Sequence, residues 1–416
     1  MLSVAEASQA ILAHVAPLAT ERVALLDALG RVLATDIRSP VTLPAWDNSA
    51  MDGYAVRSAD IAGATAERPV ALRVLETVPA GGFPSAVVRV GEATRIMTGA
   101  PLPAGADTVV RIEDTDRGTD RVAIQSDRDA TRNVRPKGED IHAGEVVLAA
   151  GLPIGPAQIG VLASVGAAYV EVRRQPRVAI LGSGDELVDL DEFDSVLAGR
   201  KIVSSNTYAL IALVRDSNAL PINLGIARDT PESLRERLAS AAGCDLLLTS
   251  AGLSVGEHDY LRDVLRDMGA EMKFWRVRMR PGAPVGFGVL GTTPWLGLPG
   301  NPVSTMVTFE LFARPAIRRM LGHVRLFRRP VDVVLEEPVT IHARLTHFLR
   351  VIVTTHIDGT LSARLTGPQG SGIVTSMSLA NALLVVPEDR TRVEPGEHLH
   401  ALPLTDDATL TTNLGL

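Results

Sequence analysis

The central part of the chain alternates short apolar runs with helical spacings of hydrophobic residues. The runs RVAIL, LPINLGI, CDLLLTS and MKFWRVR are predicted strands, and helical spacing occurs near residues 207–217, 231–242 and 259–268. Thr230, Pro231 and Glu232 open the second helix with a cap, a first-position proline and an acidic first turn. Strands that alternate with helices are typical of a parallel sheet with crossover helices. Residues 175–320 therefore predict an open α/β domain.

The flanking segments have other patterns. Residues 1 to about 40 have helical spacing, whereas residues from about 55 to 140 form short alternating runs, with a charged hairpin predicted in IEDTDRGTDRVAIQ. Residues 341–405 alternate again, with Asp358 and Gly359 predicted as a hairpin turn. The uncharged stretch 146–170 is long enough to span a bilayer, but its prolines and glycines favour a strand, a turn and a short buried helix that starts at Pro156.

Composition narrows the classes of function. The 416 residues carry 41 Lys and Arg against 48 Asp and Glu, a net charge of −7, and only 4% of them are aromatic. These values argue against a nucleic-acid partner or a membrane partner. The single cysteine, Cys244, excludes an intrachain disulfide and thiolate-rich metal cages. The N-terminal residues lack a secretory signal pattern, so we expect a cytoplasmic protein.

Carboxylates follow three of the predicted strands. Asp185 and Glu186 come after RVAIL, Asp229 after LPINLGI, and Asp259 in the loop after CDLLLTS. Loops beyond the carboxyl ends of parallel strands converge on a ligand site. Helix caps are the alternative reading for Asp229 and for Asp259. Because clustered carboxylates repel one another unless a cation compensates, the pattern predicts Mg²⁺ together with a phosphorylated substrate.

Cations and a helix start are expected beside these acids. MKFWRVR is followed by MRPGAP, so Arg276, Arg278 and Arg280 lie at the end of the fourth predicted strand. Further on, Asn301 and Pro302 predict a tight turn with an asparagine cap at a helix N-terminus, whose free N–H groups suit an oxyanion. Acids, arginines and a helix end together indicate phosphate or oxyanion chemistry.

Two weaker motifs offer other readings. Ser254 lies in a G-x-S-x-G sequence after a strand, as in serine hydrolases, but the loop continues past the serine to Asp259 and no oxyanion motif precedes it. A hydrolase is therefore a third-ranked alternative. His398 and His400 are separated by one residue, a spacing that occurs more often on a strand surface by coincidence than in a metal site.

Motifs along the whole chain resemble one enzyme family. The chain is similar to the molybdopterin molybdenumtransferases, which insert molybdate into adenylylated molybdopterin and include the E domain of gephyrin. The resemblance rests on segments that occur in the family's order: DNSAMDGYAVR, RIMTGAPLPAGADTVV, KGEDI, GSGDEL, SSNTY, SAGLSVGEHD, RPGAP, GLPGNPVST and GPQGSG.

The resemblance implies a multidomain α/β plus β fold. Its expected parts are an elongated N-terminal helical and loop domain (1–45 with 141–174), an inserted β-rich domain (46–140), a central parallel-sheet α/β molybdopterin-binding domain (175–325) and a C-terminal β-barrel-like domain (326–416). It also implies a homodimer in which the partner's inserted domain completes the active-site cleft. An adenylyltransferase that supplies the substrate is a further expected partner.

Residue roles also follow from the resemblance. The expected catalytic residues are Asp52, Glu186, Asp229 and Asp259, of which the last three are expected to hold Mg²⁺. The expected substrate-binding residues, with molybdate and adenylylated molybdopterin as substrates, are Thr98, Ser254, Arg276, Arg280, Pro284, Asn301, Ser304, Arg350 and Ser371.

Three positions depart from the family pattern. Arg276 and Arg280 stand where lysines are usual, and Ala283 stands where the family usually has another lysine. Arginine keeps the charge in a planar fork, whereas alanine removes a cation. These departures leave one alternative to the enzyme open, a non-catalytic paralogue that serves as a ligand-binding scaffold or sensor.

Overall fold

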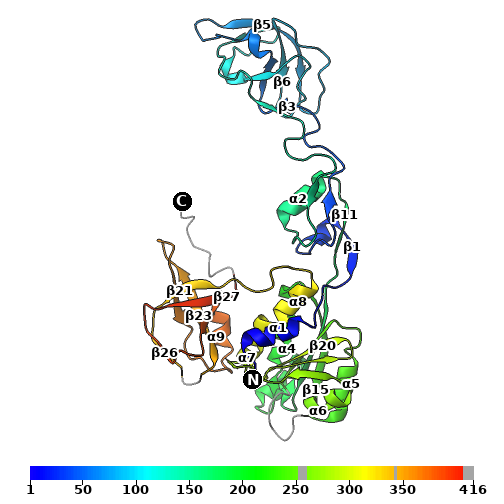
Figure 1. Ribbon diagram of the computed structural model, residues 1–416, viewed down its shortest axis with the longest axis vertical. Helices are drawn as coiled ribbons and strands as arrows, with labels where there is room; N and C mark the ends of the chain where they lie inside the picture. The colour runs from blue at the N-terminus through cyan, green and yellow to red at the C-terminus, as the bar shows by residue number, and fades with distance from the viewer. Residues whose placement is uncertain (252–259, 342–343, 406–416) are drawn as a thin grey trace. The chain divides into compact units, whose positions relative to one another are not determined.

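The computed structural model describes residues 1–251, 260–341 and 344–405, and the chain divides into two compact units (Figure 1). Unit 1 comprises Met1–Ala34, Gly151–Gly155 and Tyr169–Leu416, and unit 2 comprises Thr35–Ala150 and Pro156–Ala168. Each unit has its own hydrophobic cores, and each is described separately.

A six-stranded sheet forms the α/β part of unit 1. In spatial order it consists of β15 (Leu220–Ala227), β12 (Arg177–Ser183), β16 (Leu246–Ser250), β20 (Thr293–Leu298), β19 (Gly286–Leu290) and β17 (Glu271–Phe274). The first four strands are mutually parallel, and β19 runs antiparallel to both of its neighbours. The first three predicted strands are confirmed.

The fourth predicted strand does not occupy the expected place in the sheet. MKFWRVR supplies only β17, which ends at Phe274 and lies at the sheet edge beyond β19. The fourth parallel strand is β20, which was not among the predicted strands. Strand β17 itself is therefore separated by β19 from the parallel strands that carry the acidic loops.

Helices cover both faces of this sheet because its strands are apolar on both sides. Val178 and Ile180 of β12 belong to one core, and the alternate residues Ala179 and Leu181 belong to the other. The first core contains residues of α4 (Ser205–Asp216), α7 (Pro302–Thr308), a π-helical turn (Phe309–Ala313), α8 (Arg314–Met320) and α1 (Val4–Leu12). The second contains residues of α5 (Pro231–Ala239) and α6 (Leu261–Asp267).

The C-terminal part of unit 1 is a closed β-barrel. Its strands are β23 (Thr346–Thr355), β24 (Leu361–Leu365), β21 (Val331–Leu335), β27 (His398–Pro403) and β25 (Ala382–Val386), and β25 pairs back onto β23. The predicted turn at Asp358 and Gly359 is confirmed, since it joins the antiparallel strands β23 and β24. β18 (Met279–Arg280) pairs with β23 and so links the α/β part to the barrel.

The N-terminal forty residues were predicted to be helical, but they do not form one helical segment. Helix α1 ends at Leu12, and β1 (Thr20–Ala24) then pairs with β11 (Tyr169–Arg173). Leu25 and Leu26 lie in a single 3-10 turn, Leu25–Ala28. Pro17 falls between α1 and β1, where a proline disfavours continuation of the helix.

Unit 2 is built on a five-stranded sheet. Its order is β7 (Thr108–Arg111), β4 (Gly53–Val56), β6 (Glu92–Ile96), β5 (Val70–Val78) and β8 (Arg121–Ile124). The predicted charged hairpin is present, since Thr115 and Ile124 form an antiparallel bridge and the N–H of Gln125 donates to the carbonyl of Asp114 at 2.9 Å. Its arms belong to a larger sheet, in which β7 pairs with β4 and β8 pairs with β5. Ile112–Asp114, directly after β7, forms a 3-10 turn.

Short elements complete both units. Unit 2 also contains β2 (Ile37–Arg38) paired with β10 (Val146–Leu148), β3 (Asn48–Ser49) paired with β9 (Val134–Arg135), the 3-10 turn Ser58–Asp60, and α2 (Pro156–Ser164). Unit 1 also contains β13 (Leu187–Val188), the 3-10 turn Leu190–Glu192, α3 (Phe193–Leu197), β14 (Ile202–Val203), β22 (Val339–Thr340), α9 (Thr375–Leu379) and β26 (Arg392–Val393).

The helix that was predicted to start at Pro156 is present, but the prediction that it is buried was wrong. Leu162 is the one buried residue of α2, and its other side chains are at least partly exposed. Within the ranges that the structure describes, no helix is both long and apolar enough to cross a bilayer.

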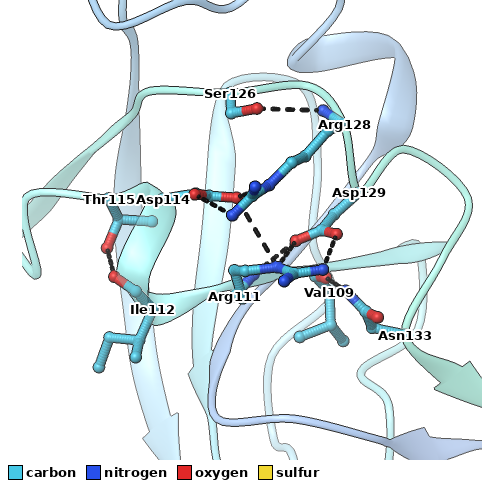
Figure 2. Close-up of polar contacts among 9 residues, drawn as sticks. All are labelled: Val109, Arg111, Ile112, Asp114, Thr115, Ser126, Arg128, Asp129 and Asn133. Atoms are coloured by element: carbon cyan, nitrogen blue, oxygen red, sulfur yellow. Dashed lines mark hydrogen bonds and ion pairs between the residues drawn. The ribbon is translucent and has the colours of Figure 1, made fainter.

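An ion-pair cluster fixes the end of β7 in unit 2 (Figure 2). The guanidinium of Arg111 donates two hydrogen bonds of 2.9 Å to the carboxylate of Asp129, whose side chain is 1% exposed. The backbone N–H of Arg111 also donates to Asp129. Beside this pair, Arg128 donates two 2.6 Å bonds to Asp114. Burial alone would raise the pKa of Asp129, but the hydrogen bonds from Arg111 outweigh burial and lower it.

Candidate functional site

A cavity of about 720 Å³ in unit 1 collects most of the predicted substrate-binding residues. Its wall includes the loop after β18, the start of α7, strand β23 and the loop after β24. The predicted residues that line it are Arg280, Pro284, Asn301, Ser304, Arg350 and Ser371. The structure therefore brings together residues that are up to 91 positions apart in the sequence, from 280 to 371.

Arg350 is the buried cation of this cavity. It lies in β23 and is fully buried. Nε donates to Ser376 Oγ at 2.9 Å, Nη1 to the carbonyl of Gln369 at 3.1 Å, and Nη2 to the carbonyl of Gly370 at 3.0 Å. Burial lowers the pKa of Arg350 from its ordinary value, although an arginine remains cationic at neutral pH. Among the described residues, no carboxylate forms an ion pair with it.

The loop after β24 is wrapped around Arg350. Gln369 accepts from the Arg350 backbone N–H at 2.8 Å and donates to the Arg350 carbonyl at 3.1 Å. The carbonyl of Ser371, two residues later, accepts from the N–H of Val303 at the start of α7. The loop thus ties the barrel to the α/β part and fixes both sides of the cavity.

The start of α7 presents polar groups to the same cavity. Asn301 occupies the N-cap position of α7, as predicted, but its side chain makes no capping hydrogen bond. Ser304 is 4% exposed, and its hydroxyl has no hydrogen-bond partner among the residues that the structure describes. Both side chains therefore remain available to a ligand in the cavity.

The RPGAP segment forms another part of the wall. Arg280 is exposed and makes no ion pair within the described ranges, so its guanidinium is free to meet an anion. Ala283 and Pro284 line the cavity three and four residues further on. Because position 283 carries only a methyl group, the wall here has no charge where the family usually has a lysine.

A second cavity of about 490 Å³ adjoins the first. It shares Pro284, Pro299 and Asn301 with the larger cavity. Its other walls include Glu186 after β12 and Asn206 at the start of α4. Asn206 donates to Ser250 Oγ at 2.8 Å and to the carbonyl of Gly300 at 2.7 Å, so three loops at the carboxyl edge of the sheet are joined.

The acidic loops after β12 and β15 are joined to each other. The N–H of Asp185 donates to Asp229 Oδ2, and the N–H of Asp229 donates to Asp185 Oδ1, both at 3.2 Å. Glu186 folds over Gly184, where an added Cβ would lie 2.6 Å from its carboxylate and φ is +146°. The positive φ favours glycine at this position. Glu186 lines the smaller cavity, whereas Asp229 lines neither cavity.

The chemistry of these groups is compatible with Mg²⁺. No group of three possible metal ligands occurs in the part of the chain that the structure describes. Mg²⁺, however, usually takes only one or two carboxylates from the protein and completes its shell with water and substrate phosphate. Glu186 provides one such carboxylate at a cavity wall. Glu186 is therefore the type of ligand that Mg²⁺ prefers.

Asp52 and Thr98 form a pair in unit 2. The N–H and the hydroxyl of Thr98 each donate to Asp52 Oδ1 at 2.7 Å. These bonds, with the backbone bond the larger cause, hold the pKa of Asp52 below its ordinary value. Asp52 lies directly before β4, and its carbonyl accepts from the N–H of Ile112. An ionised, exposed carboxylate is thereby held in a fixed place on this unit.

The remaining predicted residues are placed differently. Ser254 and Asp259 lie outside the described residues. Arg276 is exposed and lines neither cavity. The expectation that Arg278 supplies a cation beside the acids is wrong, because its guanidinium pairs with Glu388 at 3.3 Å and donates to the carbonyl of Met1.

Sequence reasoning missed several lining residues. Gln369, Asn206 and Ser250 are uncharged, and each acts through hydrogen bonds to groups far away in the chain. The sequence signal available for them was only their presence in the segments GPQGSG, SSNTY and SAGLSVGEHD, which carried the resemblance.

The comparisons with known proteins agree with this geometry. Residues 2–166 match the MoeA N-terminal region (domain I and II), residues 179–319 match a probable molybdopterin binding domain, and residues 332–404 match the MoeA C-terminal region (domain IV). The chain is 39% identical over 391 residues to the molybdopterin molybdenumtransferase of Nostoc sp., a match that covers 92% of this chain and 89% of the relative. The chain belongs to the molybdopterin molybdenumtransferase family.

Other members of this family are similar over nearly their whole length. Molybdopterin molybdenumtransferase 2 of Mycobacterium tuberculosis is 38% identical, with 92% of this chain and 95% of the relative covered. The crystal structure of the molybdopterin biosynthesis moeA protein from Pyrococcus horikoshii OT3 has a TM-score of 0.84 at 29% identity, with 97% of this chain and 100% of that chain covered. The multidomain α/β plus β fold is therefore the family's fold.

Proposed function

We propose that this enzyme inserts molybdenum from molybdate into adenylylated molybdopterin, with release of AMP, in the biosynthesis of the molybdenum cofactor. Family membership supports the class of reaction, since the curated relatives are named molybdopterin molybdenumtransferases. Neither the comparisons nor the geometry favours the scaffold alternative. Within the structure, the observation that carries the proposal is the environment of Arg350.

A buried arginine with no carboxylate partner among the described residues indicates an anion site. The four protein groups that accept from Arg350 are one hydroxyl and three carbonyls, which stabilise the cation without neutralising it. Its charge therefore acts on whatever occupies the 720 Å³ cavity, and in a site of low dielectric that attraction is stronger than in water. Molybdate, a compact dianion, is the substrate that this charge suits.

Other residues of the cavity orient the anion. Arg280 supplies a second cation at the wall, and Ser304 supplies a hydroxyl that has no other partner among the described residues. Preorganised donors of this kind lower a barrier because they need no rearrangement during the reaction. Pro284 and Ser371 shape the cavity, and Asn301 lies where the two cavities meet.

We place the pyrophosphate of the substrate in the smaller cavity, next to the oxyanion. Asn206, Ser250 and the start of α4 would hold this part of the substrate, and Glu186, Asp229 and Asp259 would hold Mg²⁺. Asp229 also fixes the loop of Asp185 by accepting from its N–H. When bound, the ion would neutralise the pyrophosphate oxygens whose bond is broken. The dithiolene sulfurs that receive molybdenum belong to the substrate, so the protein needs no nucleophile of its own, and Ser254 is assigned to substrate binding.

The proposal also includes the assembly of the enzyme. We propose a cytoplasmic homodimer in which Asp52 and Thr98 act on the substrate of the partner copy, and in which an adenylyltransferase delivers the substrate. The division into domains 1–45 with 141–174, 46–140, 175–325 and 326–416 remains part of this proposal. Arg276 is retained as a substrate contact, although it lies outside both cavities.

Complementation tests the proposed function. Expression of this chain in a strain that lacks its own molybdenum insertion step should restore the activity of a molybdenum enzyme such as nitrate reductase. The same strain with an empty vector is the control. Soluble protein without any restored activity, even with added molybdate, would favour the scaffold instead.

Ala283→Lys is expected to raise the affinity for molybdate. The new ammonium would add a third cation at the wall of the cavity, beside Arg280 and Arg350. We expect the KM for molybdate to fall roughly threefold to tenfold, as one added charge pair contributes about 1 kcal/mol. Ala283→Gln, which is similar in length but uncharged, is the control and should leave KM within about twofold. An equal effect of both substitutions would contradict the electrostatic reason.

A further inference from the structure

Unit 2 exposes a pair of aromatic side chains beside the Asp52 loop. The rings of Trp46 and Phe83 meet edge to face, with their centroids 4.9 Å apart and their planes at 69°. Trp46 is 40% exposed and Phe83 is 66% exposed. Aromatic side chains usually contribute to a core or an interface, so two that contact each other in solvent indicate a binding surface.

Hydrogen bonds fix both aromatic residues in place. Glu76 accepts from the N–H and hydroxyl of Ser85 and from the N–H of Ala86, which holds the loop that carries Phe83. The neighbour of Trp46, Asp47, accepts from the N–H of Lys137 through its carboxylate and from the N–H of Leu102 through its carbonyl. The surface is therefore built before any ligand arrives.

The aromatic pair belongs to the same group of loops as Asp52 and Thr98. The N–H of Gly99, next to Thr98, donates to the carbonyl of Ser49, which lies three residues after Trp46. Lys137 and Arg135, in the adjoining segment, are exposed and form no ion pair within the described ranges. Free cations beside an aromatic surface suit a planar ring that carries phosphate.

We infer that the exposed ring of Trp46, supported edge to face by Phe83, is a platform on which a fused heteroaromatic ring of the substrate stacks. The inference rests on the proposed function, because adenylylated molybdopterin contains two such rings, the pterin and the purine. An aromatic side chain can stack on the flat face of either ring, because stacking does not depend on which ring is present. The platform would orient the phosphorylated substrate, and Asp52 would lie next to it.

The fluorescence of Trp46 can show whether a ligand is bound to it. The other two tryptophans, Trp275 and Trp295, contact each other in unit 1, with ring centroids 5.6 Å apart. Anaerobic titration of the full chain with molybdopterin, and separately with AMP, should quench tryptophan fluorescence in the wild type. The quenching should be lost in Trp46→Phe. Quenching by molybdopterin identifies the pterin as the stacked ring, and quenching by AMP identifies the purine.

Kinetics provide the second readout. Trp46→Ala should raise the KM for adenylylated molybdopterin roughly tenfold or more and leave kcat within about twofold, whereas Trp46→Phe, which keeps a flat ring, should stay within about threefold of the wild-type KM. Val90→Ala is the control, since Val90 is an apolar side chain of unit 2 that is 73% exposed. It should change neither the quenching nor KM.

Three results would overturn the inference. One is quenching that persists unchanged in Trp46→Phe, and another is an unchanged KM in Trp46→Ala. The third is a change of oligomeric mass in Trp46→Ala without a change of KM, which would assign the pair to a contact between protein chains. Binding is measured without turnover, so Trp46-dependent quenching in a protein that inserts no molybdenum would refute the proposed function and leave the platform intact.

Discussion

Replacing Arg350 with alanine is expected to lower kcat/KM for molybdate at least about 100-fold, the usual cost of losing a preorganised charge at a reacting oxyanion. The substitution removes a fully buried cation from the wall of the 720 Å³ cavity, and Arg350 does not line the adjoining cavity. AMP release that depends on molybdate should fall in parallel, because it follows binding of the oxyanion. Initial rates at varied molybdate concentration measure both effects.

A second variant separates charge from packing at this position. Arg350→Lys keeps the cation but loses the fork that donates to Ser376 and to the loop carbonyls, so an intermediate loss is expected. Arg392→Ala removes an exposed arginine of the same barrel, one that pairs with Glu394, and should leave kcat/KM unchanged. If Arg350→Lys folds normally and Arg350→Ala, with the same circular dichroism, retains full activity, Arg350 is not the oxyanion ligand.

Asp129→Ala is expected to destabilise unit 2 by about 3 kcal/mol, a large part of the stability of a small domain. The guanidinium of Arg111 would lose both hydrogen bonds to Asp129 and keep its 3.7 Å ion pair with Asp114, and the backbone N–H of Arg111 would lose its acceptor. Hydrogen–deuterium exchange of peptides that contain β4 and β7 measures the effect and should be faster across both strands. Activity should fall as well, because Ile112, next to Arg111, donates to the carbonyl of Asp52.

The control and the pH dependence make this prediction specific. Arg73→Ala removes the exposed ion pair with Glu92 in the same unit and should cost less than about 1 kcal/mol. Because the pKa of Asp129 is lowered in the folded state, its contribution to stability is complete above its unfolded pKa of about 3.9 and disappears as the pH falls through the folded value. Equal exchange rates in Asp129→Ala and the wild type at pH 7 would contradict the structural role assigned to the pair.

Local signals in the sequence identify elements whose pattern is regular. The runs RVAIL, LPINLGI and CDLLLTS are apolar and are separated by capped helices, so three of the four parallel strands could be predicted. The fourth, β20, was not predicted, and it is held as a strand by pairing with β16 on one side and with β19 on the other. In the N-terminal forty residues, pairing of β1 with β11 outweighs the helical spacing of the leucines. Pairing over such distances leaves no local pattern.

The same limit applies to the site. Spacing alone placed acids after strands, but it could not show that Asp229 binds the loop of Asp185 instead of facing a cavity. Arg350 follows no motif of its own, and its role depends on burial under a loop whose Gln369 lies 19 residues away. Only the resemblance pointed to Arg350 before the structure was known. Its burial, and the absence of a carboxylate partner within the described ranges, give that expectation its physical reason.

Anaerobic incubation of the purified protein with adenylylated molybdopterin, molybdate and Mg²⁺ tests the central claim most directly. Molybdenum bound to the pterin and AMP released are measured in the same reaction, with and without molybdate. We expect one AMP for each molybdenum inserted, and much slower AMP release when molybdate is omitted. Binding of the pterin with neither AMP release nor molybdenum incorporation would contradict the account.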